Sequence, residues 1–416
     1  MPTVIEIEGI FQATEKVATP HRIPDFAALL APVLPDDFFR DHWERKPLHL
    51  SRGDAHYYDG VLTNDDLESI ISTADLRYPA IQLARDGGYI APEAYTKNIQ
   101  RGREFFNGVP DIAQIQSEYR SGSTVVLNAL HRTWAPLREL CESLENDFTH
   151  PVHANAYLTP EDSPGFAPHY DTHEVFVLQV AGSKRWRVFQ PPLALPHHTQ
   201  PFTPTGYDVP RPLLELELKQ GDLLYLPRGY VHAAHTSQVH SAHVTIGISV
   251  YTWVELLSEL IASSKEFHQF RTALPPGFAR RDEMKKTLKE RLAVGARGLI
   301  GNCDSDRLID DFLQKIRLAR VRQGGTFQSD SRVIGLQTKL ETPDPRHYRL
   351  STEERGTILE FAGRKFVFPD KIRVTIDEMC AKKSFCPGEL AGPLDNSGKL
   401  NLVRYLHGER FLTFVD

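Results

Sequence analysis

The sequence predicts a mixed α/β protein in which a barrel or sandwich of short β-strands is flanked by helical segments. Residues 150–252 form a series of short stretches rich in aromatic and β-branched residues, separated by Gly and Pro, which is typical of β-barrels and β-sandwiches. The stretches on either side carry apolar residues at helical spacing. A chain of 416 residues exceeds the usual size of one compact core, so we expect two or three domains.

Within the central region, the strand-like stretches are 153–159, 174–180, 185–190, 223–226, 230–237 and 243–251. The short stretch AGSK (181–184), between the second and third of them, predicts a hairpin turn. Residues 191–212 contain seven prolines, which exclude a helix or a central strand. We expect this segment to be an extended loop over one mouth of the barrel.

Upstream of the barrel, apolar residues at helical spacing predict helices within 25–43, 63–75 and 133–147. Pro32 and Pro35 interrupt the first of these segments. Thr63, followed by three acidic residues, is placed to cap the second helix.

Downstream, residues 253–323 return to helical periodicity in three segments, the last beginning at a Ser305 or Asp306 cap. Residues 324–332 (GGTFQSDSR) are typical of a linker. The remaining residues predict a small α+β module, with strands at 347–351, 357–361, 365–368 and 410–415 and helices at 372–383 and 400–408.

Composition and charge narrow the class of protein. The net charge of −6 argues against non-specific nucleic-acid binding, which normally needs a basic protein. The four cysteines, Cys141, Cys303, Cys380 and Cys386, form no C-x-x-C pair, which excludes a cysteine-built zinc or iron–sulfur site and suits a reducing compartment. The N-terminal residues MPTVIEIEGIFQATEK lack the pattern of a secretory signal, and no apolar run approaches the ~20 residues of a membrane span. We expect a cytoplasmic protein.

The first candidate metal motif is His169-Tyr170-Asp171. The triplet alone carries little weight, but here the polar loop EDSPGFAP (161–168) delivers it to the start of the apolar strand EVFVLQV. Residues i and i+2 of a strand point to the same face, so both side chains can bind one ion.

The second motif is GDLLYLPRGYVH (221–232), which combines a Gly-Asp turn, a short strand, a Pro-x-Gly turn and a histidine, His232. It matches the second sequence motif of cupin barrels, in which a glycine turn hands a histidine into the barrel. His232 lies far from Asp171 in the sequence, which places it on a different strand.

Two imidazoles and one carboxylate with open coordination positions suit Fe(II) that must also bind a 2-oxo acid and O₂. Other third ligands are His235, His240 and His243. His235 is three residues from His232 and faces the other way on a strand, and the other two lack the Pro-x-Gly turn, so His232 is preferred. The alternative is a pair of structural histidines near a loop aspartate.

The segments 153–189 and 221–232 resemble the ribosomal oxygenase group of JmjC hydroxylases. The likeness extends upstream through 38–52, 57–67 and 122–141. The resemblance implies a double-stranded β-helix (cupin/JmjC) catalytic domain in residues 1–252, with barrel strands mainly in 120–252. It further implies a helical dimerisation region at 253–323 and a winged-helix-like C-terminal module at 324–416.

The resemblance also implies cofactors and a cosubstrate site. Members of the group use Fe(II) and 2-oxoglutarate to hydroxylate a side chain of a ribosomal protein, which makes His169, Asp171 and His232 the catalytic metal ligands. It assigns Lys184 to the distal carboxylate of 2-oxoglutarate and places Asn155 and Tyr157 in the pocket.

Residue patterns bear on the same positions. Lys184 shares a strand face with Trp186 and Val188, where a charge is costly unless an anion pairs with it; otherwise it is a solvated charge at the turn. Thr245 could complete the cosubstrate end. We expect His173, beside the metal motif, to lie outside the ligand set.

The motifs and the resemblance leave three candidate functions. The first is hydroxylation of a protein or peptide side chain, the second is small-molecule hydroxylation with the same triad, and the third is JmjC demethylation. The first is preferred because the appended modules could bind a macromolecule. The apolar stripes of 253–323 further predict a homodimer through this region.

Overall fold

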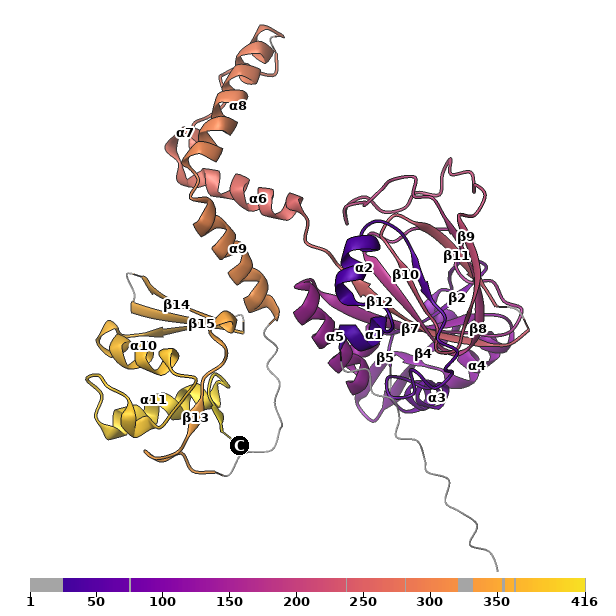
Figure 1. The fold of residues 1–416 in the computed structure, drawn as a ribbon, viewed down its shortest axis with the longest axis horizontal. Coiled ribbons are helices and arrows are strands. Elements are labelled where there is room, and N and C mark those ends of the chain that lie inside the picture. Colours follow the sequence, from indigo (N-terminus) through magenta and orange to yellow (C-terminus); the bar gives the residue numbers. More distant parts are fainter. Residues whose placement is uncertain are drawn as a thin grey trace, which may run out of the picture. The chain divides into compact units, whose positions relative to one another are not determined.

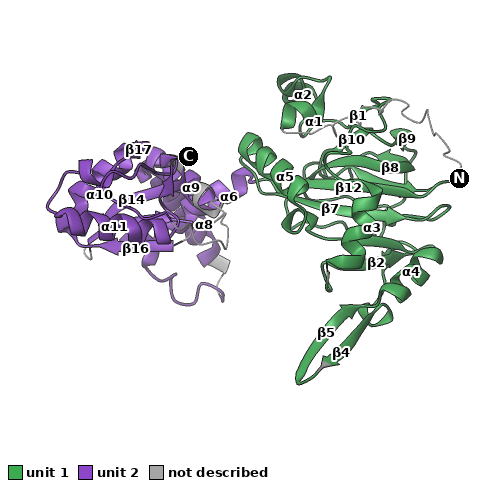
Figure 2. Ribbon diagram, turned by 90° about the horizontal axis from the view of Figure 1, so that it is seen from below, with its two compact units in different colours: residues 1–250 green, residues 251–416 purple. Residues whose placement is uncertain are grey.

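A computed structural model of the chain describes residues 25–415 apart from 75, 237, 281, 321–331, 354–355 and 363. It divides into two compact units, residues 1–250 and 251–416 (Figure 2). The N-terminal segment in which we expected no secretory signal lies outside the described residues, as does the expected linker except Arg332.

The first unit combines a large antiparallel sheet with helices and short 3₁₀ turns (Figure 1). Its helical elements are α1 (Phe26–Leu30), α2 (Pro35–Asp41), α3 (Asn64–Thr73), η1 (Pro92–Ala94), α4 (Ile112–Arg120), η2 (Leu130–Arg132) and α5 (Ala135–Phe148). Its strands are β1 (Leu48–Leu50), β2 (Ile81–Arg85), β3 (Gly88–Tyr89), β4 (Thr96–Arg101), β5 (Glu104–Pro110), β6 (Thr124–Leu127), β7 (Val152–Thr159), β8 (Glu174–Phe189), β9 (Leu214–Lys219), β10 (Leu223–Leu226), β11 (Val231–His235) and β12 (Ser241–Ile248).

The long strand β8 organises the sheet. The order of the main path is β1-β10-β8-β12-β7-β6-β2-β3, and β9 and β11 pair with β8 off this path. The first half of β8 pairs with β10 and β12, and its second half pairs with β9 and β11. One strand therefore passes from one layer of the fold into the other.

The predicted hairpin turn at 181–184 is wrong. These residues continue β8 as a single strand of 16 residues. Gly182 has φ +61°, and a Cβ there would collide with the carbonyl oxygen of His240, so glycine allows the strand to change direction without ending. As a result, Lys184 lies on a strand rather than in a solvated turn.

The other predicted strands are confirmed with small shifts of their ends. The proline-rich segment 191–212 is free of helix and strand, as expected. The strand β9 was not predicted, although its sequence LELELK alternates between less and more exposed positions.

The predicted upstream helices are confirmed as α1 and α2, α3, and α5. Thr63 caps α3 in a capping box with Asp66, whose carboxylate accepts from the Thr63 backbone N–H at 2.9 Å. These helices bury apolar side chains in one core with the sheet, including Phe26, Phe38, Leu140 and Phe176. A second cluster lies along β8 and its partners, including Val177, Trp186, Leu218 and Leu224. The two clusters fix β8, and with it the adjoining site.

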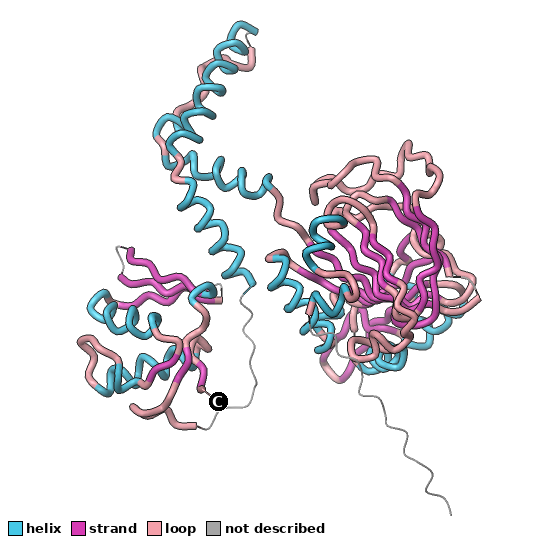
Figure 3. The backbone as a smooth tube through the Cα atoms, in the orientation of Figure 1, coloured by secondary structure: helices cyan, strands magenta, loops and turns pink. Residues whose placement is uncertain are grey.

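The second unit contains the helical elements α6 (Trp253–Ser263), η3 (Ser264–Glu266), α7 (His268–Arg271), α8 (Asp282–Asn302), α9 (Ser305–Arg320), η4 (Pro345–His347), η5 (Asp370–Ile372), α10 (Arg373–Ala381), η6 (Pro387–Glu389) and α11 (Asn396–Gly408). Its strands are β13 (Leu340–Glu341), β14 (Tyr348–Glu353), β15 (Gly356–Phe361), β16 (Arg364–Phe368), β17 (Ser384–Phe385) and β18 (Thr413–Phe414). Figure 3 shows helices alone from α6 to α9 and mixed helices and strands after them.

The helical predictions for this unit hold with three changes. The first predicted helix, 254–271, is divided into α6, η3 and α7. The α8 helix is longer than its apolar stripe indicated, and the cap of α9 is Asp304, whose side chain accepts from the Arg307 N–H at 3.0 Å. Ser305 and Asp306 are the first residues of the helix. The C-terminal module has its own core, which includes Leu359, Ile376, Met379 and Val403.

Within the described residues, no helix combines the length and the hydropathy that a membrane span requires.

Candidate metal centre

The two metal motifs are joined through their backbones. His169 and His232 exchange both hydrogen bonds, with N···O distances of 3.2 and 2.8 Å, and the Gly229 N–H donates to the Asp171 carbonyl at 3.0 Å. His169 and Asp171 lie in an extended segment that ends three residues before β8, rather than at the strand start that the sequence predicted. Pairing with His232 holds this segment extended.

Three side chains converge from these segments. The metal-binding atoms of His169, Asp171 and His232 all lie within 4.8 Å of one another, and His232 Nε2 is 3.6 Å from Asp171 Oδ2. The two imidazole rings are 4.6 Å apart. The sequence-predicted ligands therefore meet at one point.

The second nitrogen of each imidazole faces a backbone carbonyl. His169 Nδ1 is 2.7 Å from the Ala167 oxygen, and His232 Nδ1 is 3.1 Å from the Tyr230 oxygen. A carbonyl can only accept, so each Nδ1 carries the proton and each Nε2 keeps its lone pair for a metal. Two Nε2 atoms and one carboxylate match the donor set of a facial Fe(II) site, so the residues present fit the ion.

The protonation states of His232 and Asp171 suit metal binding. Burial, followed by His169, lowers the pKa of His232 to about 4, so its ring is neutral near pH 7. Burial would raise the pKa of the Asp171 carboxyl, but the surrounding histidines, His173 first, outweigh it and hold the pKa below its ordinary value. The carboxylate is therefore ionised and available.

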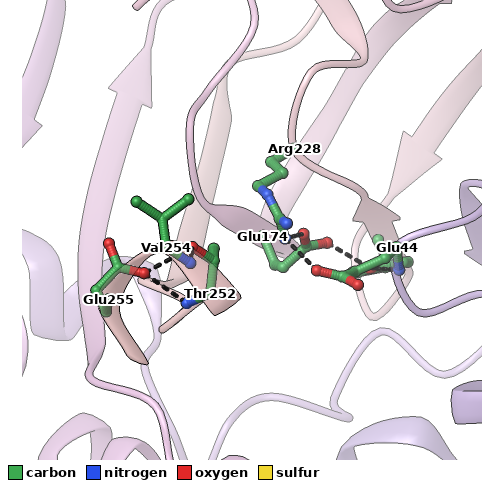
Figure 4. Close-up of polar contacts among 7 residues, drawn as sticks. Glu44, Glu174, Arg228, Thr252, Val254 and Glu255 are labelled. Carbon is green, nitrogen blue, oxygen red and sulfur yellow. Dashed lines mark hydrogen bonds and ion pairs between the residues drawn. The ribbon is translucent and has the colours of Figure 1, made fainter. Parts of the chain in front are cut away.

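A buried ion pair between Glu174 and Arg228 connects the two motifs (Figure 4). Glu174, three residues after Asp171, accepts from Arg228 at 2.8 Å and from the Tyr225 hydroxyl at 2.5 Å. Arg228 belongs to the Pro-x-Gly turn before His232 and also pairs with Glu44. Because the first segment supplies the acid and the second supplies the base, the ion pair links the segments that carry the ligands. Figure 4 also shows the capping box of α6, in which Thr252 pairs with Glu255.

The triad opens into a cavity of ≈ 360 Å³. Its lining includes all the sequence-predicted site residues: Asn155, Tyr157, His169, Asp171, Lys184, His232 and Thr245. Further lining side chains that the sequence interpretation did not assign to the site include Tyr89, Thr124, Asn128, Phe166 and His243.

Lys184 lines the cavity and is 3% exposed. Its ammonium donates to Thr159 Oγ1 at 2.9 Å, and burial lowers its pKa to about 7. The neighbouring Arg185 and Arg187 are exposed on the other face of β8, as the alternation predicted. A buried ammonium whose partner is a neutral hydroxyl is favourable only when an anion joins it.

Two further buried polar atoms of the cavity lining lack a hydrogen-bond partner within the described part of the chain. Among the described residues, neither Trp186 Nε1 nor His243 Nδ1 has a hydrogen-bond partner. The His243 ring stacks on Tyr157 with 4.9 Å between centroids, and burial, then Lys184, lowers the pKa of His243 well below its ordinary value. Together with Lys184 these atoms fit the carboxylate of a small acid such as 2-oxoglutarate.

The other predicted pocket residues lie on paired strands. Asn155 and Thr245 are opposite each other on β7 and β12, and Asn155 Oδ1 accepts from the Ala129 N–H at 2.9 Å. Burial raises the pKa of Tyr157, although hydrogen bonds to Thr245 and Asn155 oppose the rise. Asn155 and Tyr157 of β7 thus line the cavity, as the resemblance implied.

The positions of the other candidate histidines keep them out of the metal-binding group. His235 and His240 are exposed, and His243 lines the cavity without joining the metal-binding group. His173 lies beside the triad, with its ring 5.0 Å from that of His153. A Cβ on Gly247 would collide with both of these rings, so this glycine makes room for the pair.

Comparison with known proteins shows which domain family the segment around the site resembles. Residues 129–256 match the JmjC domain family, and this segment contains the triad and Lys184. This segment is therefore similar to a JmjC domain.

Its curated relatives include ribosomal oxygenases. The chain is 34% identical over 264 residues to ribosomal oxygenase 1 of Gallus gallus, which covers 60% of this chain and 42% of that protein. It is 33% identical over 266 residues to ribosomal oxygenase 2 of Rattus norvegicus, covering 60% and 54%. It is also 29% identical over 288 residues to the bifunctional lysine-specific demethylase and histidyl-hydroxylase NO66 of Dictyostelium discoideum, covering 64% and 54%. The matches span about half the length of these relatives or less.

Among solved structures, the Escherichia coli ribosomal oxygenase YcfD aligns with 92% of this chain and 98% of its own, at 16% identity and a TM-score of 0.47.

Proposed function

We propose that this protein is an Fe(II)- and 2-oxoglutarate-dependent hydroxylase of a protein side chain, with a ribosomal protein or a peptide as substrate. The observation that carries the proposal is one cavity with a three-ligand metal group, His169, Asp171 and His232, and the buried Lys184. The relatives named ribosomal oxygenases support the choice of a ribosomal substrate.

Each residue has a defined role in this proposal. His169, Asp171 and His232 would hold the iron through Nε2, a carboxylate oxygen and Nε2. Lys184 would bind the distal carboxylate of 2-oxoglutarate, close to Thr245 and Tyr157. Bound Fe(II) with O₂ and 2-oxoglutarate supplies the oxidation, which puts one oxygen atom into a substrate C–H bond and the other into succinate, with release of CO₂. The protein residues orient the reactants in a cavity that excludes bulk water.

Lys184 also contributes through its charge. Since burial lowers its pKa to about 7, the amine is partly neutral without the cosubstrate. An arriving dicarboxylate stabilises the ammonium form and draws a proton onto Nζ. Binding of the acid is therefore linked to protonation of Lys184.

Two alternatives use the same triad. A small-molecule hydroxylase would act on a free metabolite, and the printed name of the Dictyostelium discoideum relative includes a lysine-specific demethylase activity. Demethylation of an N-methyl group releases formaldehyde, because the hydroxylated carbon leaves the nitrogen.

Purified protein with Fe(II), 2-oxoglutarate and ribosomal protein from cells lacking this chain separates these functions. We expect a peptide heavier by 16 Da and an equivalent of succinate, without formaldehyde. Formaldehyde with loss of a methyl group would favour the demethylase. Succinate formed with small metabolites, and no modified peptide, would favour the small-molecule enzyme.

We further propose that the helical region 253–323 forms a homodimer interface, that 324–416 is a winged-helix-like module, and that the enzyme works in the cytoplasm. The dimer is supported by the exposed apolar stripe of α6: Trp253 is 78% exposed, Leu257 52% and Ile261 66%. Further apolar side chains are exposed on α8, including Leu292 at 75% and Ile300 at 66%. Symmetric pairing of chains would remove such surface from water.

A further inference from the structure

A tyrosine from outside the JmjC segment lines the cavity. Tyr89 ends β3, upstream of the matched residues 129–256. It reaches the site because β3 continues the large sheet from β7 through β6 and β2. Its side chain lines the cavity that contains Asp171, yet the residue is 55% exposed. Tyr89 therefore lies at the boundary between the cavity and solvent.

The loop before the metal motif is bound to the same hairpin. Phe166, three residues before His169, forms a backbone bridge with Gly87. Gly87 has φ +84°, and a Cβ there would lie 3.0 Å from the Ala167 Cβ, so this approach requires glycine. The close approach of the two segments fixes the position of Phe166 relative to Tyr89.

The two side chains form an aromatic row that ends at the metal ligands. The Tyr89 and Phe166 rings are 5.3 Å apart in an edge-to-face arrangement. Phe166 is in turn 6.0 Å from the His169 ring and 6.1 Å from the Tyr157 ring. The row leads from solvent to the point where the triad converges.

The phenol of Tyr89 lies close enough to the site to be affected by the charge of Asp171. Burial of part of the ring, followed by the negative charge of Asp171, raises the pKa of Tyr89, so the hydroxyl is protonated at neutral pH. No hydrogen bond to this hydroxyl is formed within the described part of the chain. It remains available as a donor or acceptor for a bound molecule.

The size of the cavity limits what can occupy it. A volume of ≈ 360 Å³ is at the lower end of the range for ligand pockets, about 300–1,000 Å³. With 2-oxoglutarate bound to Lys184, the remaining space suits one side chain, whose backbone would stay outside. Tyr89 is the residue at that exit.

We propose that Tyr89 and Phe166 form the wall of the channel through which the substrate side chain reaches the metal, and that the Tyr89 hydroxyl hydrogen-bonds the substrate backbone. The assignment rests on the proposed function as a polypeptide hydroxylase. Tyr89 is a specificity-determining residue for that reaction: the ring contacts the carbon stem of the side chain, and the hydroxyl sets its depth.

The test compares Tyr89→Ala and Tyr89→Phe with the wild type on ribosomal protein from cells lacking this chain. Two quantities are measured in one reaction, the peptide that gains 16 Da and the succinate formed. The Kd for 2-oxoglutarate is measured separately by calorimetry with Mn(II) in place of iron. Phe105→Ala serves as the matched control, because Phe105 is a 73% exposed aromatic residue of the same N-terminal region that does not line the cavity.

We expect Tyr89→Ala to lower the ratio of hydroxylated peptide to succinate at least about ten-fold. Both the aromatic wall and the hydrogen bond to the substrate backbone are lost in this variant. Tyr89→Phe removes the hydroxyl alone and should raise the KM for the protein substrate about three- to ten-fold. In both variants the Kd for 2-oxoglutarate should stay within about two-fold of the wild type, since Tyr89 lies at the solvent boundary of the cavity whereas Lys184 is buried. Phe105→Ala should behave as the wild type.

Full hydroxylation by Tyr89→Ala with unchanged coupling would overturn the assignment while leaving the proposed function standing. An equal loss in Phe105→Ala would also overturn it. If the wild type forms succinate but no heavier peptide, the ribosomal substrate is wrong and the assignment falls with it.

Discussion

Lys184 offers the sharpest quantitative prediction. The substitution Lys184→Met keeps most of the side-chain length but removes the charge that we assign to 2-oxoglutarate. A hydrogen bond to a charged group contributes about 1.5–3 kcal/mol, so the Kd for 2-oxoglutarate should rise roughly ten- to a hundred-fold. Calorimetry with Mn(II) gives this Kd directly, and Arg185→Met, at an exposed position of the same strand, should leave it unchanged.

The same substitution should stabilise the protein in the absence of cosubstrate. Burial lowers the pKa of Lys184 from 10.5 to about 7, a difference that corresponds to on the order of 5 kcal/mol at pH 7. Between pH 7 and 10.5 the unfolded chain binds a proton that the folded chain does not, so this destabilisation declines as pH rises, by about 1.4 kcal/mol per pH unit.

Urea unfolding at pH 7 and pH 9 measures the effect. Lys184→Met should be more stable than the wild type by a few kcal/mol at pH 7, and the advantage should shrink by roughly 2–3 kcal/mol at pH 9. The titration of groups other than Lys184 affects both proteins equally, so it cancels when the two stabilities are subtracted. An unchanged Kd together with a pH-independent stability difference would refute the reasoning and would favour an anchor at Arg185 or Arg187.

Three further predictions concern the surroundings of the site and the assembly. Gly247→Ala should displace the His153 ring, and with it the neighbours of the metal site, and weaken Co(II) binding about ten-fold, read from the cobalt absorption spectrum; an unchanged affinity would contradict this. Arg228→Met leaves the buried Glu174 carboxylate without its base and should lower the free energy of unfolding by about 3–5 kcal/mol in urea; a loss below ~1 kcal/mol would show that the pair is not structural. Leu257→Asp places a charge on the exposed stripe of α6 and should yield a monomer by light scattering, whereas a wild-type protein that is itself monomeric at micromolar concentration would refute the dimer.

The metal ligands were predictable because their local sequence specifies their geometry. A Pro-x-Gly turn before His232 and a two-residue spacing between His169 and Asp171 constrain the backbone wherever they occur in such a barrel. The structure places the three side chains together. It differs in one respect, since the first two ligands precede β8 and are held by pairing with His232.

The course of β8 could not be read from local sequence. A glycine between two strand-like stretches usually indicates a turn, and only the pairing of β8 with β12 and β9 on either side of Gly182 shows that the strand continues. The prediction for Lys184 survived because alternation along 184–188 is the same in either case.

Residues that enter the site from elsewhere were missed for a different reason. Tyr89 belongs to a stretch without a recognisable motif, and Asn128 lies in 122–141, where the resemblance assigned no site residue; sheet pairing brings them to the cavity. His243 was considered only as a metal ligand, whereas its place beside Lys184 and Tyr157 depends on the register of β12. Such long-range placements are not encoded in any short window of sequence.

The most direct test of the central claim is release of CO₂ from 2-oxoglutarate labelled at the 1-carboxylate, in the presence of Fe(II) and O₂. The wild type should release CO₂ only when Fe(II) is present. His169→Ala and His232→Ala should release none above background while keeping the circular dichroism of the wild type, since each removes one of three metal ligands. Undiminished release by either variant would contradict the assignment of the triad.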